Sequence, residues 1–264
     1  MKIGFIGCGN MASAMMGGIV KNQICSPKEI TVHDLLPAAA ERVQGAYGVV
    51  PASSNQAVVE QSQIIVLAVK PQFYEDVIRE IAPSVQEDQI IVTIAPGKTL
   101  AWLAETFGKD LPIVRTMPNT PAMVGEGITA VCPNENVAPE MLDNVLEMLG
   151  GFGRAEVIPE RLMDAVVAVS GSSPAYIFML IEAMADAAVA EGMPRQQAYT
   201  FASQAVLGSA KMVLETGKHP GELKDMVCSP AGTTIEAVQV LEETGFRSSV
   251  MQAMRTCAKK SRSM

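Results

Sequence analysis

The chain has 264 residues, 48% of them hydrophobic and 18% charged, so it can bury a sizeable core and is not a disordered chain. Its net charge of −8 argues against nucleic acid as a main partner, because a phosphate backbone requires a basic surface. The five cysteines are scattered and form no C-x-x-C pair, which argues against a disulfide framework or a metal site and favours the reducing cytoplasm.

Short apolar runs alternate with helical stretches in the first part of the chain. Helices are expected at Met11–Val20 and from Pro37. The expected strands are Lys2–Ile6, Glu29–His33, Gln63–Val69, Gln89–Ile94, Ile113–Arg115 and Ile128–Cys132. Uninterrupted apolar runs are typical of strands that are buried on both faces of a parallel sheet. The alternation predicts an α/β, doubly wound Rossmann-type domain over residues 1–160.

From Pro174 onward the sequence shows long helical patterns and no convincing strand. Pro174 and Pro194 stand where helices begin, and Gly192 and Gly217 stand where helices end. We therefore expect an all-α domain over residues 161–264. Its helices are apolar on more than one face, as in Ala198–Leu214, and such helices need packing partners on several sides. A second copy of the chain would supply them, which predicts a homodimer.

The segment most similar to a membrane span is Ala175–Ala190. It carries Glu182 and Asp186 and is shorter than the ~20 apolar residues of a typical transmembrane helix. The segment is therefore expected to be a buried helix, and no membrane span is predicted.

A glycine-rich loop follows the first strand and opens the first helix. Gly7, Gly9 and Ala12 fit the pattern G-x-G-x-x-A, whose first glycine permits a tight turn and whose second lets a pyrophosphate approach the backbone. An ordinary strand–helix turn is the alternative. Asp34, at the end of the second strand, either hydrogen-bonds the ribose hydroxyls of a dinucleotide or caps the turn into the next helix.

Four further motifs follow the glycine loop in order. They are Ala68-Val69-Lys70-Pro71, Met117-Pro118-Asn119-Thr120-Pro121, Ser170-Gly171-Ser172-Ser173-Pro174-Ala175-Tyr176 and Ser229-Pro230-Ala231-Gly232-Thr233-Thr234. Together with the glycine loop, this set resembles the pyrroline-5-carboxylate reductase family over nearly the whole chain. Two positions depart from the family pattern: Ser173 stands where the family usually has glycine, and Ala231 where it often has glycine.

The resemblance implies reduction of the cyclic imine 1-pyrroline-5-carboxylate to L-proline with NADPH or NADH. It also implies an interleaved helical homodimer, which often assembles into a larger ring. The residues expected to bind NADP or NAD are Ile6, Gly7, Cys8, Gly9, Asn10, Met11, Asp34, Asn55, Ala68, Val69, Lys70, Pro71, Ala95, Pro96 and Gly97. The glycine loop and the ends of the neighbouring strands supply most of this set, since open α/β sheets bind ligands at that edge.

Hydroxyl-bearing residues gather before the helical run Ile235–Leu241. A helix N-terminus with clustered amides and hydroxyls suits a substrate carboxylate, although a capped helix start without a ligand has the same pattern. Thr234 is the candidate catalytic residue, in contact with the ring nitrogen. The expected substrate-binding residues are Ser229, Ala231, Gly232, Thr233 and Thr234.

Two other functions share this architecture. A 3-hydroxyacid dehydrogenase would need a lysine on a C-terminal helix, for which Lys211 is the mid-helix candidate. A nucleotide-sensing protein would bind the cofactor without chemistry. The only histidines, His33 and His219, offer no catalytic histidine–carboxylate pair, which counts against a 2-hydroxyacid dehydrogenase and suits reduction of a protonated imine.

Overall fold

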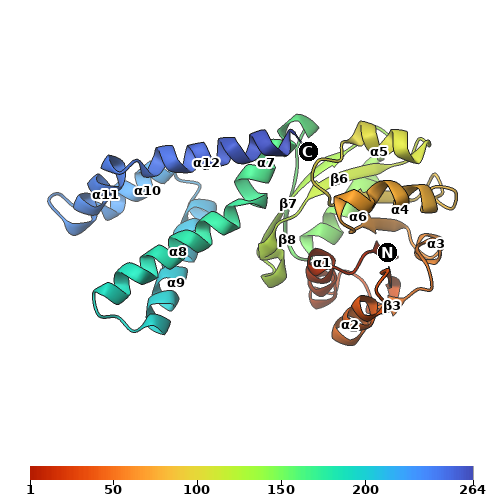
Figure 1. Cartoon of the computed structure of the whole chain (residues 1–264), viewed down its shortest axis with the longest axis horizontal. Helices are drawn as coiled ribbons and strands as arrows, with labels where there is room; N and C mark the ends of the chain where they lie inside the picture. Colours follow the sequence, from red (N-terminus) through yellow and green to blue (C-terminus); the bar gives the residue numbers. More distant parts are fainter. Residues whose placement is uncertain (264) are drawn as a thin grey trace. The chain divides into compact units, whose positions relative to one another are not determined.

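A computed structural model describes residues 1–263 of the chain, and these fall into two compact units (Figure 1). Unit 1 comprises Met1–Ser172 and the end of the chain from Cys257 onward, and unit 2 comprises Ser173–Thr256. The boundary between the two units, after Ser172, therefore lies further along the chain than the domain boundary that the sequence predicts near residue 160. Met163 explains part of this difference, because it is buried beside Ala130 and Cys132 of the sheet.

The strands of unit 1 are β1 Ile3–Ile6, β2 Ile30–His33, β3 Val50–Pro51, β4 Ile64–Leu67, β5 Ile90–Thr93, β6 Ile113–Met117, β7 Gly127–Pro133 and β8 Gly153–Val157. Its helices are α1 Asn10–Lys21, α2 Pro37–Tyr47, α3 Asn55–Glu60, α4 Tyr74–Ile81, α5 Leu100–Phe107, α6 Pro139–Gly150 and α7 Met163–Val166. Short 3-10 turns lie at η1 Pro27–Glu29, η2 Pro71–Phe73, η3 Thr120–Val124 and η4 Glu160–Leu162, and a π-helical turn at η5 Val167–Gly171.

The strands form one sheet in the order β3-β2-β1-β4-β5-β6-β7-β8. All neighbours are parallel except β6 and β7, which are antiparallel. The order reverses between β1 and β4, so the carboxyl ends of these strands open onto the crevice where α/β sheets bind ligands. This topology confirms the predicted doubly wound Rossmann-type sheet.

Both faces of the sheet are covered because successive side chains of each central strand point to opposite sides. Ile3 and Phe5 pack with helices α1, α2 and α6 on one face. Ile65 and Leu67 pack with α3, α4 and α5 on the other. The predicted strand at Gln63–Val69 is therefore confirmed as β4, buried on both faces.

The sequence analysis did not predict two of the strands, β3 and β8. β3 is only Val50–Pro51, too short to carry a periodic signal. β8 is half exposed and polar, but its first residue, Gly153, is a usable signal. Gly153 has φ 149°, and a Cβ there would lie 2.0 Å from the carbonyl oxygen of Gly127 on β7, so only glycine fits this close pairing.

All regular elements of unit 2 are helices, as predicted. It contains α8 Ser173–Ala190, α9 Arg195–Thr216, α10 Pro220–Val227, α11 Thr233–Glu243 and the first part of α12 Phe246–Ser261. Helices α8 and α9 pack against each other across a short connection. Gly192 and Gly217 follow α8 and α9 with positive φ, as expected of residues that end helices.

The predicted burial of Ala175–Ala190 is wrong for the single chain. In α8 only Ala185 is buried, whereas Phe178 and Met179 are 60% and 68% exposed. On α9, Phe201 and Leu214 are similarly open. A helix that is apolar on several faces but packs against one neighbour leaves the other faces for a partner chain.

By length and composition, one segment among the described residues could cross a membrane. It runs from Glu160 to Ala190 with a mean hydropathy of 1.5, and 6% of its most apolar stretch is buried in the single chain.

Candidate active site

The glycine loop lies at the carboxyl edge of β1 and leads directly into α1. The Gly7 N–H donates to the carbonyl oxygen of His33 at 2.8 Å, and Gly7 has φ 101°. A Cβ at Gly7 would lie 2.7 Å from the carbonyl oxygen of Ala68, so glycine is required there. The loop is thus fixed to the ends of both neighbouring strands.

The next part of the loop is open on the side where α1 begins. A Cβ at Gly9 would have no atom within 4 Å, and Gly9 caps α1 without a side-chain hydrogen bond. The first amides of a helix lack intrahelical partners and attract anions. Space beside the backbone and a helix N-terminus fit a pyrophosphate, so the loop residues suit the predicted dinucleotide.

Of the two roles that the sequence left open for Asp34, the structure shows the one in the turn after β2. The Asp34 Oδ2 accepts the Cys8 N–H at 2.7 Å, and its Oδ1 accepts the Leu36 N–H at 2.9 Å. It does not cap α2, because the N-cap of that helix is Leu36. The carboxylate therefore shapes the turn and the glycine loop while it stands at the strand end where Rossmann proteins bind the ribose.

The other predicted cofactor residues of unit 1 gather at the same edge. Asn55 is the first residue of α3; its Oδ1 lies 2.8 Å from His33 Nδ1, and its Nδ2 donates to Glu80 at 2.8 Å. Lys70 is exposed after β4, and Ala95 is buried after β5. The structure brings these positions together with the glycine loop.

Tyr74, which sequence reasoning missed, joins two of these strand ends. Its hydroxyl donates to the carbonyl oxygen of Leu67 at 2.5 Å and accepts the Ile94 N–H at 3.3 Å. Burial raises the pKa of the Tyr74 hydroxyl, so it stays neutral and keeps its proton for this bond. Tyr74 follows Pro71 closely in the sequence, but its partners become visible only in the folded sheet.

A partly buried ion pair between β6 and η4 was also missed. Arg115 Nη1 on β6 lies 2.7 Å from Glu160 Oε1, and the same oxygen accepts the Leu100 N–H at 2.8 Å. The Arg115 side chain is 7% exposed and that of Glu160 is 33% exposed, so the guanidinium is removed from water while the carboxylate is partly solvated. Glu160 thus fastens the start of α5 to the sheet.

Two of the family-like motifs meet in unit 1. Asn119 donates from Nδ2 to the carbonyl oxygen of Ser170 at 3.1 Å, and its Oδ1 accepts the Ile128 N–H at 2.9 Å. Gly171 lies against Met117, because a Cβ there would be 2.9 Å from the Met117 Cε. The π-helical turn η5 carries this contact, and such turns are frequent at functional sites.

The predicted substrate loop belongs to unit 2 and opens α11. The Gly232 N–H donates to the carbonyl oxygen of Ser229 at 3.0 Å, and Gly232 is the N-cap, so Thr233 and Thr234 form the first turn. Ala231 has φ 55°, the left-handed region that favours glycine. Ser229, Ala231 and Thr233 are exposed and Thr234 is half-buried. The predicted helix start is therefore present, with its hydroxyls accessible.

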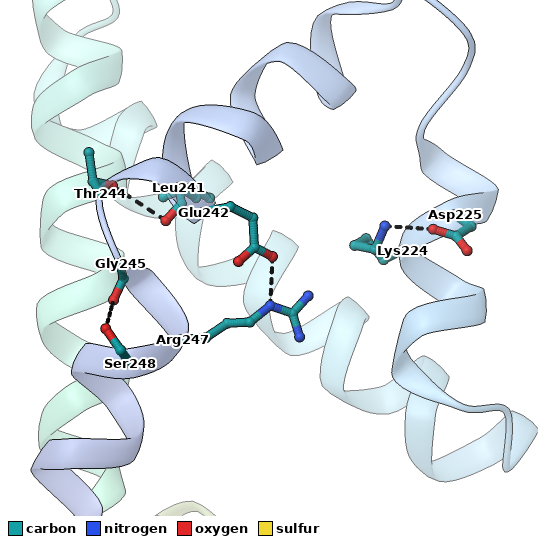
Figure 2. A network of polar contacts seen from close by, with 8 residues as sticks. All are labelled: Lys224, Asp225, Leu241, Glu242, Thr244, Gly245, Arg247 and Ser248. Carbon is teal, nitrogen blue, oxygen red and sulfur yellow. Dashed lines mark hydrogen bonds and ion pairs between the residues drawn. The ribbon is translucent and has the colours of Figure 1, made fainter.

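Separate polar contacts close the other end of α11 (Figure 2). Figure 2 shows Glu242 accepting from Arg247 Nε at 2.6 Å and the Thr244 hydroxyl donating to the carbonyl oxygen of Leu241 at 3.4 Å. The Thr244 hydroxyl also donates to the carbonyl oxygen of Val240 at 2.8 Å. These contacts make Thr244 a structural threonine.

Neither histidine nor Lys211 forms a catalytic arrangement within the described residues. His219 caps α10 by accepting the Gly221 N–H at 3.0 Å. Lys211 is 66% exposed and lies 3.4 Å from Glu215 on the same helix. Lys224, on α10, is a second mid-helix lysine of unit 2. Within residues 1–263, no three His, Cys, Asp or Glu side chains are grouped to hold a metal ion.

The fold and open glycine loop of unit 1 define a Rossmann-type dinucleotide-binding protein. Residues 2–97 match the family described as NADP oxidoreductase, coenzyme F420-dependent. Residues 160–264 match the family described as pyrroline-5-carboxylate reductase dimerisation.

Relatives of known identity cover the whole chain. Pyrroline-5-carboxylate reductase of Escherichia coli is 55% identical over 98% of this chain and 97% of its own length. The Methanosarcina acetivorans enzyme of the same name is 44% identical over 100% of this chain and 97% of its own length. The chain belongs to the pyrroline-5-carboxylate reductase family.

Solved structures agree over both units. A Coxiella burnetii pyrroline-5-carboxylate reductase has a TM-score of 0.92 and 31% identity, covering 99% of this chain and 97% of that one. A Plasmodium falciparum pyrroline carboxylate reductase with NADP bound has a TM-score of 0.90 and 32% identity, covering 100% and 97%. The exposed apolar faces of α8 and α9 thus belong to a dimerisation domain.

Proposed function

We propose that the protein reduces 1-pyrroline-5-carboxylate to L-proline with NADPH or NADH, the last step of proline biosynthesis. The observation that carries this proposal is family membership over the full chain, combined with an open glycine loop and an accessible hydroxyl-bearing helix start. A 3-hydroxyacid dehydrogenase is disfavoured because Lys211 is exposed and paired with Glu215. A purely nucleotide-sensing protein would not need the Ser229–Thr234 loop.

The residues of the chain bind and orient the reactants. The amides at the start of α1 and the ends of β1, β2, β4 and β5 hold the dinucleotide. When bound, the reduced nicotinamide would supply the hydride for the imine carbon, and the protonated ring nitrogen of the substrate would take the electron pair of the C=N bond. Ser229 and Thr233 hold the substrate carboxylate at the start of α11, and Thr234 hydrogen-bonds the ring nitrogen.

A matched pair of threonine variants tests the role of Thr234. Thr234→Ala should lower kcat for pyrroline-5-carboxylate by about 10-fold or more, as for other positioned polar groups. Cofactor affinity should not change, because unit 1 carries the glycine loop. Thr244→Ala removes the same atoms at the other end of α11 and should leave kcat unchanged. A normal kcat for Thr234→Ala would exclude Thr234 from the reaction.

The protein is a homodimer that acts on a small molecule. We also propose that the dimers assemble into larger rings and that the protein works in the cytoplasm, where its five free thiols would stay reduced. Light scattering at assay concentration tests the assembly. A mass of one dimer would exclude the ring, and an active monomer would contradict the role assigned to the exposed faces of α8 and α9.

A further inference from the structure

The peptide groups of Cys8, between the two loop glycines, are held by opposite charges. Asp34 Oδ2, at the end of β2, accepts the Cys8 N–H at 2.7 Å. Arg42 Nη2, on α2, donates to the Cys8 carbonyl oxygen at 2.6 Å. The two charges also act oppositely on the Cys8 thiol, whose pKa the carboxylate raises and the guanidinium lowers. A carboxylate and a guanidinium therefore lie within a few ångströms of the same residue of the cofactor loop.

The two groups differ in how firmly they are held. Asp34 is half-buried and accepts from a second backbone amide, that of Leu36, at 2.9 Å. Arg42 is exposed, and its contact with Cys8 uses one of several guanidinium N–H donors. The ion pairs within the described residues do not include one between Asp34 and Arg42. The anion is fixed in place, and the cation can exchange its partner.

The chemistry at this strand end distinguishes the two cofactors. A carboxylate there accepts the ribose 2′-hydroxyl of NADH and repels the 2′-phosphate of NADPH, whereas a nearby arginine accommodates that phosphate. Guanidinium groups bind phosphates through two parallel hydrogen bonds, which a carbonyl oxygen does not offer. Phosphate therefore competes well for a guanidinium that is otherwise bound to a carbonyl.

We infer that Asp34 and Arg42 form a cofactor-selecting pair that lets the chain use both NADH and NADPH. Asp34 receives the ribose hydroxyl of NADH, while Arg42 leaves the Cys8 carbonyl for the 2′-phosphate of NADPH. This inference rests on the proposed function only for its kinetic readout, since cofactor binding is measured without substrate.

The test compares charge variants by titrating the purified protein with NADPH and with NADH, using fluorescence of the reduced cofactor. Arg42→Gln should weaken NADPH binding by about 10-fold or more and leave NADH binding within about 2-fold, because only NADPH carries the phosphate. Asp34→Ser should have the opposite effect: it should strengthen the binding of NADPH and weaken the binding of NADH. Arg79→Gln removes an exposed cation from α4, where Arg79 pairs with Glu75, and should change neither.

Two further measurements make the outcome decisive. Arg42→Lys keeps the positive charge but cannot form two parallel hydrogen bonds to one phosphate. Its affinity for NADPH should therefore lie between those of Arg42→Gln and the unchanged protein. The same variants are then assayed for pyrroline-5-carboxylate reduction, where the KM for each cofactor should follow the binding data. Equal weakening of both cofactors by Arg42→Gln would show that Arg42 only supports the loop, and no change would remove it from the site; either result overturns the inference. Selective binding changes without imine reduction would instead contradict the proposed function alone.

Discussion

Breaking the ion pair of Arg115 and Glu160 should destabilise unit 1 strongly. Glu160→Gln leaves the Arg115 guanidinium, whose side chain is 7% exposed, without its carboxylate at 2.7 Å. Removing one partner of a buried pair costs ~3–5 kcal/mol, and we expect the lower end because water reaches Glu160, which is 33% exposed. For a protein of this size, a loss of ~3 kcal/mol lowers Tm by roughly 6–12 °C.

Thermal unfolding followed by circular dichroism, at one fixed protein concentration, measures this loss. Glu75→Gln is the matched control, because Glu75 forms an exposed pair with Arg79 on α4 worth at most about 0.5 kcal/mol. Its Tm should change by less than about 2 °C. Adding Arg115→Met to Glu160→Gln should restore most of the loss, since the unpaired buried cation is then removed. Equal Tm values for the two glutamine variants would refute the reasoning.

Three further predictions concern other parts of the chain. Ala231→Gly should raise the free energy of unfolding by up to about 1 kcal/mol in denaturant titrations, because φ at this position is 55°. A lower free energy of unfolding would show that alanine is not strained in this turn. Burial chiefly, and the Asp34 carboxylate secondarily, raise the pKa of the Cys8 thiol to about 12. Since the thiolate is the reactive form, iodoacetamide near about pH 8 should modify Cys8 last and half-buried Cys228 sooner, as peptide mass spectrometry would show. Early labelling of Cys8 would contradict the burial of its side chain. Finally, a chain inactivated at Gly9 and a chain inactivated at Thr234 can be co-expressed. The mixture should regain part of the activity if the two chains of a dimer share their active sites. Heterodimers without activity would show that each chain uses only its own residues.

Local signals in the sequence were sufficient for much of the fold. The glycine loop, the apolar strand runs and the helix-ending Gly192 and Gly217 depend on neighbouring residues, so they are visible without coordinates. β3 and β8 were missed because a two-residue strand and a half-exposed polar strand have no periodic pattern. The apolar surfaces of α8 and α9 were correctly interpreted as needing partners, but the expected burial of α8 is not reached within the single chain, where only Ala185 is buried.

The candidate site, like the fold, was predicted only in part from the sequence. The positions of Gly7, Gly9 and Thr234 follow from motifs, since a turn or a helix start is encoded within a few residues. Tertiary structure decided that Arg42 reaches the Cys8 carbonyl, that Tyr74 joins two strand ends and that Glu160 pairs with Arg115. Each of these contacts joins residues from different elements, and only the packing of helices on the sheet brings their side chains within hydrogen-bonding distance.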